Sequence, residues 1–497
     1  MSQNPSPALE EGSIYDLSIA GRRASTIPSK EAGLPSAGDS LPAGMLRADS
    51  PHLPEVSELD LVRHYTNLSR KNWSIEVGAY PLGSCTMKYN PKIHEQTAAL
   101  PGFSRLHPWQ PAEQAQGALA LIYEMEQLLV EITGMARASF QPAAGAAGEL
   151  TGLLIMRAYH RAQGSPRDTV LIPDSAHGTN PATVRLAGYK VKQIPTDGRG
   201  LVDLEAVRSA MSENVAGLML TNPNTLGLFE REIEEIAKAV HSKGGLLYYD
   251  GANLNAIVGI IRPGDMGFDV VHINMHKTFT TPHGGGGPGS GPVAVSSRLE
   301  PFLPGPIPDL DQGTGRYFWD EDRPQSIGRV HGFYGNFGMV VRAYTYLISL
   351  GADGLHNLSE RAVLNANYLR SRLEDTYQTA HPGLCMHEFV LTARKLRREH
   401  GVRAMDIAKR LIDKGFHPPT VYFPLVVEEA MMIEPTETES KQTLDALAQA
   451  FLEIAAEAVD DPEVLHNAPV RSPVGRLDEA RAVRQLQTRW RPPGTGQ

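Results

Sequence analysis

Short apolar runs alternate with segments of helical pattern between residues 138 and 296, and this alternation limits the possible folds more than any other feature. The apolar runs predict strands at residues 138–141, 169–173, 191–195, 215–221, 246–250, 270–274 and 292–296. Helical patterns between them predict helices at residues 142–163, 180–187, 203–211 and 230–242. This order is typical of a mainly parallel, doubly wound α/β sheet with helices on both faces. In such sheets, ligands bind beyond the carboxyl ends of the strands.

The chain has 497 residues, too many for one simple core. We expect an N-terminal arm and extension (residues 1–111), a large α/β domain (112–345) and a smaller C-terminal α+β domain (346–497). The first 54 residues are rich in Pro, Ser, Gly and Ala and predict an irregular arm. An amphipathic helix at residues 112–133 opens the large domain. In the C-terminal domain, helices are expected at residues 360–374, 403–414 and 441–458, and strands at "HEFVLTA" and "TVYFPLVV".

Composition excludes several classes of function. The net charge is -9 and the pI about 6.0, which gives no general attraction to nucleic acid or an anionic membrane. Two basic clusters, "ARKLRREH" (393–400) and "RAVRQLQTRWR" (481–491), favour solvated helix faces over docking patches for an acidic partner. The only cysteines, Cys85 and Cys385, cannot form a disulfide scaffold and fit a cytoplasmic protein. Neither a secretory signal in the first 50 residues nor a membrane-spanning apolar stretch is expected.

Four features with chemical potential lie at the ends of predicted strands. Lys277 follows the strand at 270–274 in "HINMHKTFTTPHGGGGPGSG", and Asp250 ends "GLLYYD". His177 follows "TVLIPD", and "AAGAAGE" (143–149) joins a strand to a helix. Taken singly, each feature has an ordinary structural explanation. Lys277 could be a surface charge, Asp250 and His177 could be turn or cap residues, and residues 143–149 could pack a helix tightly on the sheet. Their recurrence at successive strand ends favours a shared site.

The four features match the needs of a pyridoxal 5'-phosphate enzyme. Such an enzyme needs a lysine amine for a covalent imine link and a carboxylate that keeps the pyridine nitrogen protonated. It also needs a flat group against the ring and small residues at a helix N-terminus for the phosphate. Lys277, Asp250, His177 and residues 143–149 offer one candidate for each need.

His272 and His276 are four residues apart, which on a helix would suggest a metal site. Their segment is predicted as a strand, in which four residues span about 13 Å at roughly 3.3 Å per residue. We therefore expect no metal. His276 is predicted to contact the cofactor phosphate, and His272 to be a buried strand histidine.

Longer motifs resemble a known family. "DGANLNA", "DVVHINMHKTFTTPHGGGGPGSGPV", "PLGSCTMKYNP", "QPAAGAAGE", "DSAHGTNPA" and "HEFVL" are similar to motifs of the glycine cleavage system P-proteins, from about residue 61 to the C-terminal region. The resemblance implies a fold type I pyridoxal phosphate enzyme, like aspartate aminotransferase. Full-length P-protein chains are about twice as long and have two homologous halves. A chain of this length with the lysine resembles the separate second subunit of the two-subunit bacterial form.

The resemblance assigns roles around the cofactor ring. It implies that Lys277 carries the covalent link and that Asp250 pairs with the pyridine nitrogen. Ala252 would lie under the ring, and His177 would stack on the opposite face.

Other roles concern the phosphate and the phenolic oxygen. Ala146 and Ala147 match the phosphate-loop positions, although the family often has histidine where Ala147 stands. Asn222 or Thr225 would reach the phenolic oxygen of the cofactor.

The implied activity is decarboxylation of glycine. Carbon dioxide would be released, and the aminomethyl group would pass to the lipoyl arm of the small H-protein. The resemblance also implies a partner, a first P-protein subunit that is like the N-terminal half of the long chains, in an α2β2 assembly. The glycine loop at 284–291 would then be a wall or gate for the lipoyl arm, or else a plain tight turn. Cys85 would be a redox-sensitive thiol or, as we favour, a small buried apolar residue. Two alternatives remain open: another fold type I enzyme, such as an amino-acid decarboxylase or cysteine desulfurase, and a non-catalytic scaffold subunit.

Overall fold

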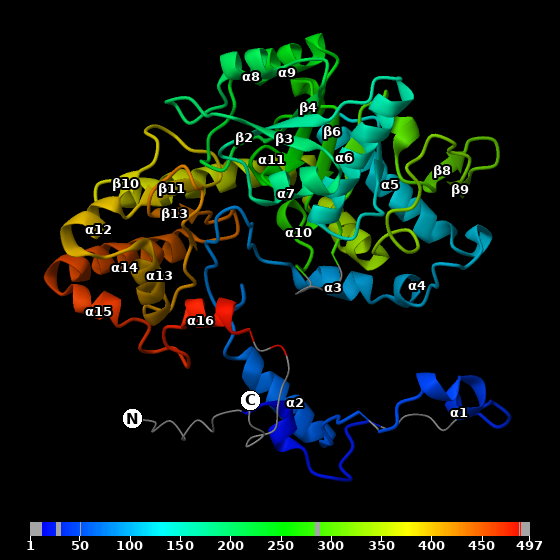
Figure 1. The fold of residues 1–497 in the computed structure, drawn as a ribbon, viewed down its shortest axis with the longest axis horizontal. Coiled ribbons are helices and arrows are strands. Elements are labelled where there is room, and N and C mark those ends of the chain that lie inside the picture. The colour runs from blue at the N-terminus through cyan, green and yellow to red at the C-terminus, as the bar shows by residue number, and fades with distance from the viewer. Residues whose placement is uncertain (1–11, 26–30, 50, 284–288, 487, 489–497) are drawn as a thin grey trace. The chain divides into compact units, whose positions relative to one another are not determined.

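The computed structural model describes residues 12–25, 31–49, 51–283, 289–486 and 488 (Figure 1). The chain divides into two compact units, residues 1–74 and 75–497. The elements of the first unit are η1 (Ile14–Leu17), α1 (Ala37–Ser40), η2 (Ala43–Met45) and α2 (Glu58–Ser69). These pieces are short and separated by turns, and only α2 exceeds four residues. The domain boundaries expected at residues 111 and 345 stay predictions.

A seven-stranded sheet forms the centre of the second unit, with the strand order β1-β7-β6-β5-β4-β2-β3. Its strands are β1 (Arg137–Ser139), β2 (Thr169–Pro173), β3 (Lys190–Ile194), β4 (Val215–Thr221), β5 (Leu246–Gly251), β6 (Val270–Ile273) and β7 (Val293–Val295). Strands β3, β2, β4, β5 and β6 pair in parallel, whereas β7 is antiparallel to both of its neighbours. The predicted mainly parallel, doubly wound sheet is therefore confirmed.

Both faces of this sheet are covered, because every residue of its central strands β4, β5 and β6 is buried and most of these residues are apolar. Leu246 and Tyr248 of β5 pack into one hydrophobic cluster, and Leu247 and Tyr249 pack into the cluster on the opposite face. This alternation follows from the twofold side-chain period of a strand. The covering helices and neighbouring short elements are α3 (Lys92–Ala98), α4 (Pro101–Ser104), η3 (Ala112–Gln114), α5 (Gln116–Thr133), α6 (Gly145–Ala162), α7 (Thr179–Leu186), α8 (Leu204–Ala210), α9 (Ile233–Ser242), η4 (Leu254–Ala256), η5 (Pro263–Met266) and α10 (Met275–Thr278).

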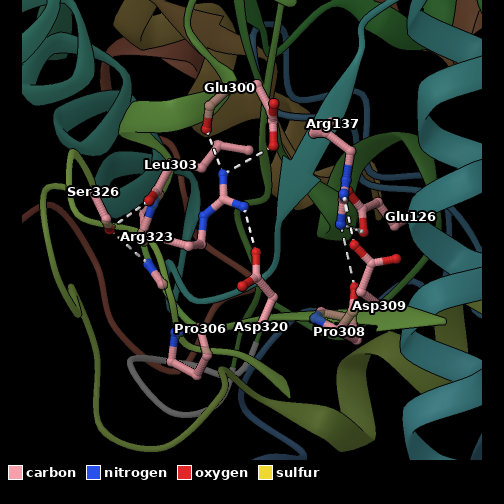
Figure 2. A network of polar contacts seen from close by, with 12 residues as sticks. Glu126, Arg137, Glu300, Leu303, Pro306, Pro308, Asp309, Asp320, Arg323 and Ser326 are labelled. Carbon is pink, nitrogen blue, oxygen red and sulfur yellow. Dashed lines mark hydrogen bonds and ion pairs between the residues drawn. The ribbon is translucent and has the colours of Figure 1, made fainter. Parts of the chain in front are cut away.

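A polar network fixes the hairpin of β8 (Ile307–Asp311) and β9 (Arg316–Asp320) beside β1 and α5 (Figure 2). Arg137 donates to Glu126 at 2.7 Å, to Asp309 at 3.2 Å and to the carbonyl of Pro308 at 3.2 Å. Arg323 donates to Asp320 at 2.8 Å and to the carbonyl of Glu300, in η7 (Glu300–Phe302), at 2.6 Å. These charge-assisted bonds tie the hairpin to the edge of the large sheet.

A four-stranded antiparallel sheet with the order β10-β11-β13-β12 forms a second layer, drawn in yellow to orange in Figure 1. Its strands are β10 (Gln378–Thr379), β11 (Phe389–Thr392), β12 (Thr420–Val421) and β13 (Ala430–Ile433). The helices of this region are α11 (Phe337–Leu373), α12 (Arg394–His400), α13 (Ala404–Asp413), α14 (Lys441–Asp460), α15 (Pro462–His466) and α16 (Glu479–Arg484). A separate hydrophobic cluster lies between this sheet and helices α11, α13 and α14, as expected for a smaller α+β region.

The helix expected at 360–374 is confirmed as the end of α11, which begins earlier, at Phe337, and is kinked at Gly351, where φ is 63°. The strand expected at 420–427 was wrong in length. It ends after Val421, because Tyr422 has a left-handed φ of 59°, and Pro424 beyond it has no N–H to donate to a sheet. Met431 and Met432 are fully buried in β13.

The first basic cluster lies on α12, which has no buried residue, as expected for a solvated helix face. The second overlaps α16, and its residues 487 and 489–491 lie outside the described residues. Among the described helices, none is both long and apolar enough to cross a lipid bilayer.

Candidate active site

The carboxyl ends of β2, β4, β5 and β6 lie along one edge of the large sheet, because these strands are parallel and adjacent. His177 follows β2 and Asn222 follows β4. Asp250 is the second-last residue of β5, and Lys277 lies on α10 directly after β6. The sheet therefore brings these predicted residues to a common edge.

Asp250 is the most tightly held of these residues. Its Oδ2 accepts a hydrogen bond from Nδ2 of Asn180 at 2.9 Å, and its Oδ1 accepts one from the backbone N–H of Ala252 at 3.0 Å. Nε2 of His272 lies 3.2 Å from Oδ1, because Asp250 and His272 are directly paired in the β5–β6 register. Burial alone would raise the pKa of Asp250, but His272 and Asn180 hold this pKa well below its usual range. Asp250 is therefore a buried carboxylate that stays ionised.

His272 and Asn180 extend this network. Nδ1 of His272 lies 3.1 Å from the hydroxyl of Tyr248, and Nδ2 of Asn180 also donates to Glu149 at 3.0 Å. Burial lowers the pKa of His272, but the neighbouring Asp250 and Glu149 raise it above its ordinary value overall. Burial and the adjacent Asp250 raise the pKa of Glu149. The predicted buried strand histidine is thus also the ionic partner of Asp250.

Lys277 is half-buried, and its Nζ donates to the carbonyl oxygen of Ser84 at 2.7 Å. Ser84 belongs to the motif "PLGSCTMKYNP", whose Gly83 bonds to Met432 of β13. The side chain of Lys277 therefore lies where the large sheet, the segment at 81–91 and the small sheet meet. The adjacent Cys85 is partly exposed, and burial raises the pKa of its thiol.

His177 lies at the start of the loop before α7. Its Nδ1 accepts the backbone N–H of Thr179 at 3.2 Å and contacts the Thr179 hydroxyl at 2.9 Å. Its ring packs edge-on to Phe423 with centroids 5.5 Å apart. Burial, then the charge of Lys277, lowers the pKa of His177, so that its ring is neutral near pH 7. A neutral ring held in this way suits the predicted stacking role.

The N-terminus of α6 fits a phosphate. The helix begins after Ala144, which gives no side-chain cap, and Ala146 in its first turn is exposed. Its first backbone N–H groups therefore have no intrahelical acceptor and point toward a potential anion. A Cβ on Gly145 would overlap Asn274, and one on Gly148 would overlap the carbonyl of Gly291. Only glycine allows the helix start and the strand-end loops to approach so closely.

Unpartnered polar atoms support the same fit. Thr278 on α10 and Ser290 before β7 each have a buried hydroxyl without a hydrogen-bond partner among the described residues. Such groups are costly to bury unless a ligand or water satisfies them. Together with Lys277, the ionised Asp250 and the α6 N-terminus, they fit the chemistry of pyridoxal 5'-phosphate.

Other predicted contacts are less direct. Oδ1 of Asn222 accepts the backbone N–H of Glu230 at 2.9 Å, and the hydroxyl of Thr225 donates to the carbonyl of Ser175. Both side chains are thus committed to the loop after β4, and their predicted contact with the phenolic oxygen gains no support. His276 packs edge-on to His283 at 4.6 Å, and burial lowers its pKa to about 3, so it can offer the phosphate only a neutral ring. Of the glycine loop, residues 284–288 lie outside the described residues.

One group near Lys277 was missed by sequence reasoning. His387, Glu388 and Glu434 are fully buried, and their ligand-type atoms lie within 4.8 Å of one another. The N–H of Ser84, whose carbonyl accepts from Lys277, donates to Glu388 at 2.8 Å. The quoted motif "HEFVL" contains two of the three residues, but only the strand pairing brings Glu434 beside them.

Residues 37–314 match the sequence model of the glycine cleavage system P-protein, and residues 358–469 match that of the glycine dehydrogenase C-terminal domain. A probable glycine dehydrogenase (decarboxylating) subunit 2 from Caldanaerobacter subterraneus is 58% identical over 96% of this chain and 98% of its own length. The chain belongs to the glycine cleavage system P-protein family. The corresponding protein of Exiguobacterium sibiricum is 57% identical over 97% of this chain and 98% of its own length.

Solved structures agree with this assignment at the level of fold. A crystal structure of glycine decarboxylase (P-protein) covers 84% of this chain and 95% of its own, with a TM-score of 0.71 and 22% identity. A cysteine desulfurase from Thermococcus onnurineus covers 74% of this chain and 92% of its own, with a TM-score of 0.58 and 14% identity. This P-protein chain therefore has fold type I, and its cofactor is pyridoxal 5'-phosphate.

Proposed function

We propose that this chain is the catalytic second subunit of a two-subunit glycine dehydrogenase (decarboxylating). It would decarboxylate glycine and pass the aminomethyl group to the lipoyl arm of an H-protein. It would form an α2β2 assembly with a first P-protein subunit. This assembly would work in the cytoplasm. The observation that carries the proposal is the pairing of an ionised, buried Asp250 with Lys277 at neighbouring strand ends, in a chain of this family.

The cofactor, when bound, supplies a sink for the electrons left when the Cα–carboxylate bond of glycine breaks. In our proposal Lys277 holds the cofactor covalently, and its free amine moves protons at the reacting carbon. Asp250 keeps the pyridine nitrogen protonated, and His272 and Asn180 keep Asp250 ionised for that task.

The remaining residues would hold and orient the cofactor. The N–H groups at Ala146 and Ala147 would bind the phosphate at the start of α6. His177 and Ala252 would lie on opposite faces of the ring. His276 stays the predicted phosphate neighbour, and Asn222 and Thr225 stay weaker candidates.

Exchange of labelled carbon dioxide into glycine tests the proposal. The chain should catalyse this exchange when combined with the partner subunit and lipoylated H-protein. Lys277→Ala should abolish the exchange and the visible absorbance of the bound cofactor, whereas Lys192→Ala, at an exposed position in β3, should change neither. Borohydride trapping followed by mass spectrometry should place the label on Lys277. Activity toward cysteine without exchange into glycine would instead favour a desulfurase.

A further inference from the structure

Two buried glutamates face each other beside Lys277. Phe389 of β11 is paired with Ile433 of β13, so that Glu388 and Glu434 occupy the next opposed positions of this antiparallel pair. Directly opposed residues have Cβ atoms about 4.5–5.5 Å apart. Two carboxylates so close in a buried site ionise together only at a large free-energy cost, unless a nearby positive charge offsets their repulsion.

Hydrogen-bond donors distinguish the two carboxyl groups. Oε2 of Glu388 accepts the N–H of Ser84 at 2.8 Å, and its Oε1 accepts Nδ2 of Asn253 at 3.2 Å. Oε1 of Glu434 accepts the hydroxyl of Thr86, but its Oε2 has no partner among the described residues. Donors on both oxygens favour the ionised form of Glu388, whereas a bare oxygen favours a proton on Glu434. Burial raises the pKa of Glu388 well above its ordinary value and that of Glu434 to about 7, so the pair keeps a proton near pH 7. The hydrogen bonds, and not these shifts, place that proton on Glu434.

Lys277 reaches this pair through Ser84. Its Nζ donates to the Ser84 carbonyl, and the N–H of the same residue donates to Glu388. The charge of Lys277 lowers the pKa of both glutamates against the larger effect of burial. The protonation of the pair must therefore respond to the charge on Lys277.

Three other charged or titratable groups lie around the pair. Lys88 is paired with Glu437 at 2.6 Å, and burial lowers the pKa of Lys88. Burial, then Lys277, lowers the pKa of His387 to about 3, and burial raises the pKa of the Cys85 thiol. Lys277 is thus the neighbour whose charge changes during the proposed reaction.

The same residues could be taken for a metal site, since His387, Glu388 and Glu434 are common ligands. Three of the four carboxylate oxygens, however, already accept hydrogen bonds from protein donors. The ammonium group of Lys277 would also repel a divalent cation. Proton sharing explains the arrangement better.

We propose that Glu388 and Glu434 share one proton, and that Lys277 receives it when its ε-amino group is released from the cofactor. This inference rests on the proposed function. The lone pair of the neutral amine forms the new N–H bond, and the O–H electrons stay on the Glu434 carboxylate. The pair and the lysine together carry one net negative charge before and after the transfer. Lys277 is thereby recharged without a proton from solvent.

The matched test variant is Glu434→Gln. Its amide oxygen can accept from Thr86 while its NH2 group takes the place of the bare Oε2, so that it mimics a permanently protonated glutamate. Glu388→Gln would place an NH2 group against a protein donor and should be the less stable variant. The opposite order of stability would show that the proton lies on Glu388 and would overturn the assignment.

Infrared spectroscopy of protein with 13C-labelled glutamate carboxyls tests the shared proton without measuring activity. The cofactor-loaded wild-type chain should show a protonated carboxyl band at neutral pH that is absent from Glu434→Gln. The same band should weaken in the cofactor-free chain, where Lys277 is a free ammonium, and should persist in cofactor-free Lys277→Met. An identical band in all four samples would overturn the proposal.

Kinetics test the proton transfer itself. Glu434→Gln should lower kcat for exchange by roughly 10²-fold or more, the usual range for losing an acid–base group, and should leave the KM for glycine nearly unchanged. Glu230→Gln is the control, because burial also raises the pKa of Glu230 to about 7 but its contacts are with Val202 and Asn224. It should change stability and not the pH profile of kcat. An unchanged kcat in Glu434→Gln would refute the transfer, whereas an inactive wild-type chain with the expected infrared bands would refute only the proposed function.

Discussion

Asp250 depends on neighbours contributed by other elements. A carboxyl buried this deeply would normally keep its proton, because desolvation disfavours the charged form. His272 on β6 and Asn180 on α7 reverse this preference through an ionic contact and a hydrogen bond. In the proposed mechanism, the electron-sink function would therefore depend on two residues that need not touch the cofactor.

Replacing His272 tests this dependence. His272→Leu should raise the pKa of Asp250 and reduce protonation of the pyridine nitrogen, so kcat for exchange should fall about tenfold or more, as expected for about one pKa unit. The exchange rate and the pH dependence of the cofactor absorbance would show the change. His241→Leu is a matched control, because His241 contacts Asp269 at 2.9 Å before β6, away from the carboxyl edge. Equal losses in both variants would contradict the prediction.

The same ion pair predicts a pH dependence of stability. The folded pKa of His272 lies above its ordinary value of about 6.5, so its contribution is full below that pH and is lost as pH rises through the folded pKa. The folded pKa of Asp250 is depressed, so its contribution is lost only in strong acid. The difference in melting temperature between wild type and His272→Leu, both cofactor-free, should therefore be larger at pH 6 than at pH 9. A difference that grows with pH would contradict the assigned charge.

Sequence reasoning could select Lys277 and Asp250 because each follows a recognisable apolar strand. It could not select Asn180 or Glu434, because their roles come from contacts across 70 and 46 positions of the chain, respectively. The sequence could have indicated the role of His272, since a histidine inside an apolar strand needs a buried hydrogen-bond partner. The site residues themselves stay predictions until they are tested.

At the scale of elements, the close contact between α6 and the segment before β7 sets the position of the proposed phosphate site. A Cβ on Gly148 would overlap the carbonyl oxygen of Gly291, and backbone cannot move aside as a flexible side chain can. Gly148→Ala should therefore displace the helix start and weaken cofactor binding at least tenfold, measured by titration of the cofactor-free chain. Gly117→Ala is the control, because nothing lies within 4 Å of its added Cβ and alanine favours a helix. Unchanged affinity in Gly148→Ala would mean that the two segments can separate freely.

Element prediction succeeded where periodicity was strong and failed where tertiary contacts decided the outcome. β2 and β4 begin and end at the predicted residues, since each is a bounded apolar run. α11 was mostly missed because Gly351 interrupts its pattern and the helix continues through a kink. β13 was not predicted as a strand, because its apolar run is four residues long and fits helix or strand equally.

For the molecule as a whole, the alternation of strands and helices was enough to predict the fold class, because parallel strands require helical crossovers. The relation between the two sheets could not be predicted, since it depends on the segment at 81–91. Lys88 in this segment is buried and bonds to Asn255 beside the large sheet at 2.7 Å and to Glu437 beyond β13 at 2.6 Å. A single ammonium group thus connects both sheets.

Removing this connection should destabilise the second unit. Lys88→Met removes the ammonium group from Glu437 and Asn255, which keep only their bond to each other at 3.3 Å. Breaking a buried ion pair in this way costs about 3–5 kcal/mol. Chemical denaturation followed by circular dichroism would measure the loss. The double variant Lys88→Met/Glu437→Leu should recover much of it, because replacing both members of a buried pair by apolar residues is often neutral. If the double variant loses as much unfolding free energy as the two single variants added together, Lys88 acts mainly through Asn255. The hydrogen bond to the large sheet, rather than the ion pair, would then hold the two layers together.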